Sequence, residues 1–420
     1  MFMRGLLRFS FVILMFIWLI SNLDQVLLAF LGHINFRLIK YLVYFSLVIC
    51  SVFVTKALKI ESLRLAIPII SISLLIGSSV LTSYDITITA IRFVLFSLFM
   101  IGLFIFVNTF TNEEIIGIID KFYLISSSFI IVTSLYLLTH REFYIFAFYQ
   151  GNFKGIFYNA NFLGAFIGIF LLPYAFSRVI CCKHRVVFDL LLAFFLLFIL
   201  VETRSRAAMS SFLVGSCFGF YAFWKGFNGK LTKSKKIIFS IFLILIFSLS
   251  GIIFQLLYSK YNNASASLNT RTYIWIAHLE VFGERPLIGW GYGINPVAQD
   301  FSLKTKYEGL VNVRKGTTEK GNTYIALLEE LGAIRGALIV LMLFILIFKI
   351  LGRNSSISYF DIFSKINLLT SIIHVNFESW LFYPGNILTF LFWLILLLQM
   401  KNYNRGYNER NYYSDNCVRC

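Results

Sequence analysis

The chain has 420 residues, of which 59% are hydrophobic and 14% are charged, and its mean hydropathy is +0.80. A soluble domain carries roughly a quarter charged residues, so this composition excludes an ordinary soluble protein and indicates a helical membrane protein. The formal net charge of +17 fits cationic loops that fix membrane topology better than it fits nucleic-acid binding. The six cysteines offer no disulfide framework.

Apolar runs of roughly 20 residues recur along the chain and predict an all-α integral membrane protein, a polytopic bundle of about twelve transmembrane helices. The first run follows two arginines and lacks a small-residue cleavage site, so we expect it to be a retained span. Residues 1–420 are interpreted as a single multispan membrane domain. The predicted spans centre near residues 9–31, 41–55, 65–83, 88–108, 115–138, 156–177, 186–201, 207–224, 237–257, 323–348, 362–381 and 386–400.

Lysine and arginine gather on alternate loops of this predicted bundle, and the loops between them carry fewer cations. The positive-inside rule then places both termini in the cytoplasm, with a cytoplasmic tail at 401–420 and one long periplasmic loop at 258–322. The periplasmic side lacks ATP and nucleotide sugars. Chemistry there therefore needs a substrate that was activated beforehand, such as a lipid-linked one.

Two arginines occupy the tight turn "VETRSRAAMSS" on the cation-poor side, where Glu202, Arg204 and Arg206 lie between two predicted spans. The guanidinium is a forked, permanently charged donor that suits phosphate or diphosphate. The alternative is that these side chains only snorkel to the membrane interface. The placement of the pair favours a binding role.

The run "NTRTYIWIAHLEVFGE" is polar and aromatic among apolar neighbours. On a helix, Arg271, Ile274, Trp275, His278 and Phe282 would share one face. An arginine beside an aromatic platform suits an anionic head group or a sugar. An amphipathic helix lying on the bilayer, with a snorkelling arginine, is an equally good interpretation.

The next residues, "RPLIGWGYG", place Gly289, Gly291 and Gly293 around Trp290. Closely spaced glycines after a proline predict a tight turn with close backbone approach. Trp290 is either part of that site or an interfacial belt residue.

Further ionisable residues lie on the predicted outer side. Arg314 and its cationic neighbours could attract phosphorylated lipid or form a solvated face, and Glu378 in "FESWLFYPGN" is a functional candidate because it lies at or near membrane depth. The scattered histidines other than His278 are interpreted as structural. These are His33, His140, His184 and His374.

Four motifs in chain order resemble the family of bacterial O-antigen polymerases and O-antigen ligases, over roughly residues 155–400. "GIFYNANFLGAF" is similar to its G-x-F-x-N-x-N element, and "TRSRAA" to T-x-S-R-[GA]. "RTYIWIAHLEVFGERPLIGWGYG" matches R-x-x-x-W followed by P-L-x-G-x-G, and "GNTYIALLEELGAIRG" resembles H-N-x-Y-L-x-x-L-x-E-x-G-x-x-G. This chain has Gly321 where the last motif has histidine.

The resemblance implies a multispan glycosyltransferase of the bacterial cytoplasmic (inner) membrane, with its active site on the periplasmic face and an undecaprenyl-diphosphate-linked oligosaccharide as donor. It implies that Arg206 and Arg271 are the catalytic residues, which hold the donor diphosphate and stabilise charge on the leaving group. No metal or other cofactor is implied. The expected substrate-binding residues are Arg204, Ser205, Trp275, His278, Gly289, Trp290, Gly291, Arg314, Asn322 and Glu378.

The leading hypothesis is an O-antigen or capsule repeat-unit polymerase, which transfers a growing glycan from one lipid diphosphate onto another lipid-linked repeat unit. The expected partners are that lipid-linked oligosaccharide, membrane lipid and a chain-length regulator protein, without nucleic acid. A ligase that transfers glycan to lipid A core is the alternative within the class. A lipid-linked oligosaccharide flippase is the alternative from another class, and it predicts inverted repeats, discontinuous helices and charges at the bilayer midplane.

Overall fold

The computed structural model describes residues 60–140, 143–149, 151–181, 186–226, 268–296, 320–352 and 358–405, together with Met15 and Leu19. Within these residues the chain is helical apart from connecting turns and one short antiparallel hairpin, β1 (Phe148–Tyr149) and β2 (Asn152–Phe153). The helices are α4 (Ile60–Ser78), η1 (Ser79–Thr82), α5 (Ile86–Thr109), α6 (Asn112–Thr139), α7 (Tyr144–Ala147), α8 (Ala160–Phe166), η3 (Ile167–Leu171), α9 (Leu172–Cys181), α10 (Val186–Glu202), α11 (Arg206–Gly226), α13 (Leu268–Glu284), α16 (Thr323–Leu351), α17 (Tyr359–His374) and α18 (Ile387–Arg405).

Four helices in the described part of the chain are long and apolar enough to cross a membrane. They are α5, α6, α16 and the continuous helix Ala160–Cys181, which comprises α8, η3 and α9. Shorter apolar helices cover Ala66–Thr82 and Ile387–Asn402. The prediction of an all-α membrane protein is confirmed, and the total of about twelve spans stays a prediction. Apart from Met15 and Leu19, the predicted spans at 9–31, 41–55 and 237–257 lie outside the described residues.

Short polar side chains start these helices where the sequence changes from loop to apolar run. Asp85 accepts a hydrogen bond from the backbone N–H of Ile88 at the start of α5. Thr111 and Glu114 form a reciprocal capping box at the start of α6, and Ser358 caps α17. Each cap satisfies backbone donors that a helix end leaves open. These positions therefore fix where the apolar helices begin.

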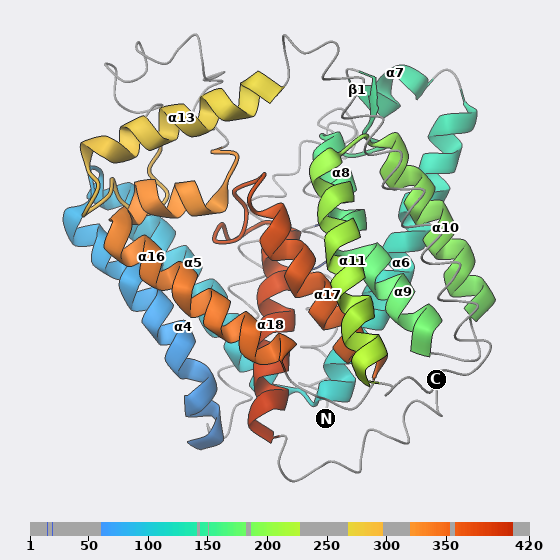
Figure 1. Cartoon of the computed structure of the whole chain (residues 1–420), viewed down its shortest axis with the longest axis horizontal. Helices are drawn as coiled ribbons and strands as arrows, with labels where there is room; N and C mark the ends of the chain where they lie inside the picture. The colour runs from blue at the N-terminus through green and yellow to red at the C-terminus, as the bar shows by residue number, and fades with distance from the viewer. Residues whose placement is uncertain are drawn as a thin grey trace, which may run out of the picture.

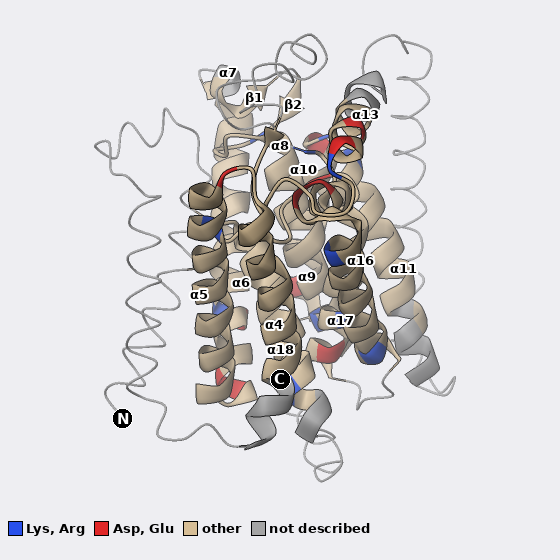
Figure 2. Ribbon diagram, turned by 90° about the vertical axis from the view of Figure 1, so that its left-hand side faces the viewer, with Lys and Arg blue, Asp and Glu red and all other residues tan. Residues whose placement is uncertain are grey.

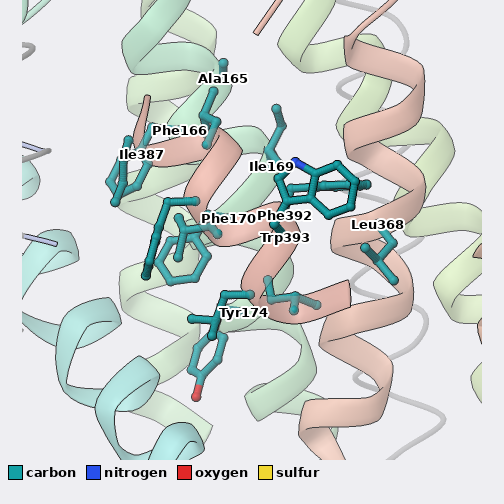
Figure 3. Close-up of a cluster of buried hydrophobic side chains, with 14 of the residues drawn as sticks. Ala165, Phe166, Ile169, Phe170, Tyr174, Leu368, Ile387, Phe392 and Trp393 are labelled. Atoms are coloured by element: carbon teal, nitrogen blue, oxygen red, sulfur yellow. The ribbon is translucent and has the colours of Figure 1, made fainter. Parts of the chain in front are cut away.

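The helix Ala160–Cys181 forms the centre of the bundle, because the whole of its apolar window is buried. Phe166, Phe170 and Tyr174 lie along it as successive ring contacts, and Figure 3 shows them in the same buried cluster as Trp393 of α18. Its middle turn, η3, is a π-helix, a rare local widening that changes the direction of the following residues. The surrounding helices α10, α11 and α17 pack directly against α9.

One end of the bundle collects the segments that the sequence marked as candidate sites. The β1–β2 hairpin, the turn between α10 and α11, and α13 all lie at the upper end in Figure 1. Figure 2 shows basic and acidic residues on α13 and on the segments beneath it. The connection from α5 to α6 and the end of α16 lie at the opposite end. The candidate site segments within the described residues therefore lie at one end of the bundle.

The predicted span at 362–381 differs from the structure. Helix α17 ends at His374, and residues 375–386 form an irregular connection to α18. This connection is stabilised by partners outside it: Asn322 donates to the carbonyl of Asn376, and Trp393 donates to the carbonyl of Leu381. Within a membrane, irregular backbone is tolerated only where protein groups satisfy its hydrogen bonds. Hydropathy alone misses that possibility.

Candidate functional site

Helix α13 lies across the upper end of the bundle, above α16 (Figure 1), against which it packs. The helix predicted over this run is confirmed. Ala277, His278 and Val281 are buried, and Trp275 is half-buried, so the expected aromatic face is turned towards the protein. The backbone of Arg271 lies in the first turns of α13, and its side chain lies outside the described part of the structure.

The glycine turn after α13 inserts into a break in α16. Gly332 has φ 79° and ψ 167° inside that helix, which interrupts the helical hydrogen bonds. The backbone N–H groups of Trp290 and Gly291 then donate to the carbonyls of Glu329 and Glu330, at 2.9 and 2.8 Å. The turn thus supplies the partners that the broken helix lacks, as a buried backbone requires.

The approach of these two segments explains the glycine spacing. Gly289 has φ +66°, and a Cβ there would lie 2.4 Å from the backbone nitrogen of Gly332. A Cβ on Gly332 would lie 2.2 Å from the carbonyl oxygen of Leu287. The predicted tight turn with close backbone approach is therefore confirmed, and its physical cause is backbone pairing with α16.

Trp290 is a packing residue of this turn. Its indole N–H donates to the carbonyl of Val281 at 3.0 Å, and its ring is buried. The guanidinium of Arg285 stacks 4.6 Å from the ring centroid, a cation–π contact. The interpretation of Trp290 as a belt residue on the bilayer is wrong, because the ring ties the turn to α13.

Four ionisable side chains form a buried cluster beneath α13, which we call the inner ion cluster: His278, Lys320, Glu329 and Glu330. The Nζ of Lys320 lies 3.0 Å from Glu329 Oε1 and 2.8 Å from Glu330 Oε1. The Nδ1 of His278 lies 2.6 Å from Glu329 Oε2. Each of the four is at most 4% exposed. Burying a charge costs desolvation free energy, so a charged side chain at this depth in the protein requires an oppositely charged partner.

Backbone groups and a tyrosine complete the cluster. The N–H of Gly293 donates to Glu330 Oε2 at 2.7 Å, Lys320 also donates to the carbonyl of Ile294 at 2.8 Å, and the hydroxyl of Tyr383 donates to Glu330 Oε1. Burial alone would lower the pKa of Lys320, but the two carboxylates outweigh it and raise that pKa. Burial raises the pKa of Tyr383 well above its ordinary value, and the carboxylate of Glu330 raises it further.

The second group of predicted residues lies in the turn between α10 and α11. Thr203 and Ser205 are buried against α8, where a Cβ on Gly164 would lie 2.6 Å from the Cβ of Ser205. Arg204 takes φ 51° and is exposed, and Arg206 is half-buried in the first turn of α11. The small residues thus fix the turn, and the arginines lie beside a helix N-terminus, which favours anions.

The remaining predicted residues have different places. Asn322 caps α16, accepting from the N–H groups of Tyr324 and Ile325 at 2.8 and 3.2 Å. Glu378 is half-buried in the 375–386 connection, and its carbonyl accepts from Thr323 at 3.1 Å. Arg314 lies outside the described residues. The structure thus brings His278, the glycine turn and the start of α16 into one group, with Trp275 joined to Gly321 by an indole hydrogen bond of 3.1 Å.

Comparison with known families gives one match. The family model described as O-antigen ligase matches residues 191–340. This stretch is similar to the O-antigen ligase family. It contains the α10–α11 turn, α13, the glycine turn and the first half of α16. No curated protein matches the chain.

The O-antigen ligase match supports a membrane glycosyltransferase of the ligase or polymerase type, and it supports these two equally. Such proteins are associated with membranes and lipid-linked oligosaccharides. Among the described residues, no group of three or more His, Cys, Asp or Glu side chains could hold a metal ion. The geometry at this end of the bundle offers arginines for anion binding and one buried histidine–carboxylate pair.

The sequence placed Glu329 and Glu330 in the motif "GNTYIALLEELGAIRG" but did not indicate that they form a buried cluster. Glu329 and Glu330 lie within a helix that is otherwise apolar, and an ionisable residue at such a position is a functional candidate by default. Lys320 looked like part of a solvated cationic loop, yet it is buried. Tyr383 gave no signal in the sequence, because its partner Glu330 lies 53 residues away.

Proposed function

We propose that this protein is a repeat-unit polymerase that transfers a glycan chain from undecaprenyl diphosphate onto another lipid-linked repeat unit. The observation that carries the proposal is the position of the family-matched segments. The α10–α11 turn with Arg206, and α13 with Arg271 in its first turns, lie at the same end of the bundle (Figure 1). That end would bind the donor diphosphate and neutralise the charge that builds on it as the glycosidic bond breaks.

The same end faces the periplasm in this proposal. Basic residues at the opposite end include Arg178, Lys349 and Lys401, and cations concentrate on cytoplasmic loops. A periplasmic site of this kind has no nucleotide sugar available, which favours a lipid-diphosphate donor. In the cytoplasmic membrane both termini would then lie in the cytoplasm.

Gly321 favours a polymerase over a ligase. The resemblance implies a histidine at this position in ligases, where it takes the acid/base role, and glycine has no side chain to do so. Here Gly321 has φ +65°, and a Cβ there would lie 3.4 Å from Trp275 Nε1. The position is therefore packed against an aromatic side chain of α13.

One observation points towards a transporter, the runner-up from another class. Helix α16 is discontinuous at Gly332, and Glu329 and Glu330 lie beside the break, as in transporters whose broken helices bind ions. However, the glycine turn donates to both of their carbonyls, and Lys320 neutralises part of their charge. This closed arrangement favours a rigid scaffold for an enzyme.

Deletion of the gene tests the proposal directly. In a host that makes lipopolysaccharide, loss of a polymerase leaves core capped with one repeat unit, which a gel of surface polysaccharide displays. Bare core together with accumulated undecaprenyl-linked polymer would assign the ligase instead. Unchanged repeat-unit transfer in extracts, with lipid-linked units trapped on the cytoplasmic side, would assign the flippase.

Arg206 provides the residue-level test in the complemented deletion strain. Arg206→Ala should abolish polymer at an unchanged protein level in the membrane, and Arg206→Lys should restore little, because a point charge lacks the fork geometry. Arg271→Ala should behave alike. Lys121→Ala is the control, because it removes an exposed cation from α6. Wild-type polymer from both arginine variants would remove the proposed donor site.

A further inference from the structure

The pairing of His278 with Glu329 fixes the state of the imidazole ring. The carboxylate oxygen Oε2 lies 2.6 Å from Nδ1, and a carboxylate can only accept a hydrogen bond in its ionised form. The hydrogen of the neutral ring therefore resides on Nδ1, and the lone pair resides on Nε2. A carboxylate that orients a histidine in this way also stabilises the imidazolium that forms when Nε2 takes up a proton.

Oε1 of Glu329 makes no hydrogen bond but lies 3.0 Å from Nζ of Lys320, so the side-chain atom of the inner ion cluster with neither kind of partner is Nε2 of His278. It is buried and has no hydrogen-bond partner, whereas the charged atoms of Lys320 and Glu330 each have several. An unsatisfied buried polar atom costs about 1–3 kcal/mol and calls for an explanation. Packing alone would be served better by an apolar residue. Because the other side-chain N and O atoms of the cluster are paired, the open position leaves Nε2 able to accept a proton.

We propose that Nε2 of His278 is the proton acceptor for the attacking hydroxyl of the acceptor glycan, with Glu329 as its positioning residue. This inference rests on the proposed glycosyl-transfer function. The acceptor oxygen forms a bond to the anomeric carbon of the donor, and its proton passes to Nε2. The bond from that carbon to the diphosphate oxygen breaks, and the electron pair leaves with the undecaprenyl diphosphate. The imidazolium then releases the proton to solvent or to the departing diphosphate.

The other described groups of the cluster are committed elsewhere. Glu330 accepts from Lys320, Tyr383 and Gly293, and Lys320 carries a positive charge that two carboxylates stabilise. These groups come from α16, the segment before it, the glycine turn and the 375–386 connection. Lys320, whose Nζ lies 3.0 Å from Oε1 of Glu329, pairs with that carboxylate, and the other carboxylate oxygen accepts from Nδ1 of His278.

Access to His278 requires α13 to shift, because the histidine has no exposed surface. The outward side of α13 is exposed at Ile276, Leu279 and Glu280, so no described element covers it from above. The base is thereby kept from water until an acceptor displaces the helix. Such exclusion protects an activated donor from hydrolysis.

Two substitutions separate a base from a structural residue. His278→Asn places an amide N–H where Nδ1–H was, so the hydrogen bond to Glu329 is kept while the proton acceptor is lost. The probe is the undecaprenyl-diphosphate-linked repeat unit extracted from the deletion strain, and chain elongation is followed with the purified full-length protein. We expect kcat to fall by about 10²- to 10⁴-fold, the contribution of a general base, with KM little changed. Glu329→Gln should lower kcat less and alter its pH profile.

His140→Asn is the matched control, because His140 is an exposed histidine at the same end of the bundle, following α6. Wild-type kcat from a folded His278→Asn variant would overturn the inference. If that variant does not fold, the wild-type pH profile decides. A general base requires kcat to fall tenfold per pH unit on the acidic side of its titration, and a profile that stays flat down to the pH at which the protein unfolds would overturn the assignment.

The elongation assay distinguishes a failure of this inference from a failure of the proposed function. Wild-type protein that does not elongate the probe would contradict the polymerase itself. Elongation that is lost in Arg206→Ala but kept in His278→Asn would leave the polymerase intact and remove His278 from its mechanism.

Discussion

Gly332→Ala should destabilise the protein, because it places a side chain where the glycine turn meets the broken helix. The residue has φ +79°, and the added Cβ would lie 2.2 Å from the carbonyl oxygen and 2.5 Å from the carbonyl carbon of Leu287. A non-glycine residue in such a conformation costs of order 1–3 kcal/mol. Because the obstructing atoms are backbone, the turn must also move away from α16.

That movement weakens the hydrogen bonds from Trp290 and Gly291 to the carbonyls of Glu329 and Glu330, each worth about 0.5–1.5 kcal/mol. Together with the strain, we expect the free energy of unfolding to fall by about 2–6 kcal/mol. The measurement is a titration of the purified protein with sodium dodecyl sulfate in mixed micelles, followed by far-ultraviolet circular dichroism.

Gly283→Ala is the matched control, because nothing lies within 4 Å of a Cβ at that position in α13. It should raise the free energy of unfolding by up to about 1 kcal/mol through helix propensity. Equal free energies of unfolding for Gly332→Ala and the wild type would show that the turn does not depend on the backbone contact described above.

Three further predictions concern the same region. Lys320→Met leaves the carboxylates of Glu329 and Glu330 without their cation and should lower the free energy of unfolding by about 3–5 kcal/mol. Adding Glu330→Gln should recover part of that loss in the same titration. If the double variant recovers none of it, the pairing of Lys320 with Glu330 is contradicted. The pKa of Lys320 is raised in the folded protein, so its stabilising charge is fully present below its ordinary pKa of about 10.4. That contribution is lost as pH rises through the folded value. Thermal unfolding midpoints should therefore fall only above about pH 10, and a fall near neutral pH caused by this lysine would contradict the assignment. Trp290→Phe keeps the ring beside Arg285 but leaves the carbonyl of Val281 without its indole donor, which should cost about 1–3 kcal/mol. An unchanged free energy of unfolding would show that this hydrogen bond contributes nothing.

The family match makes a membrane glycosyltransferase the starting point for experiments on this protein, and the structure names the residues to test first. Arg206 tests donor binding, and His278 tests proton transfer. The two residues lie on separate segments at one end of the bundle, the first turn of α11 and the buried side of α13. Their variants therefore report on different steps of one reaction.

The sequence by itself determined the features that depend on local composition. Apolar runs predicted the membrane helices, since lipid tolerates only backbone that is hydrogen-bonded within its own segment. The spacing of His278 and its neighbours predicted a two-faced helix, and the glycines from Gly289 to Gly293 predicted a tight turn. Each of these depends on residues that are close in the chain, so pattern alone is sufficient.

Only the tertiary structure decided which polar groups meet. The inner ion cluster joins His278, Lys320 and Glu329 to Tyr383 of the 375–386 connection, part of which hydropathy assigned to a span. The glycine turn fills a break in a helix some 40 residues further on. Whether Lys320 is solvated or buried depends on carboxylates that reach it only after folding. Burial of charge is decided by the presence of a partner in space, and a single sequence does not specify that partner.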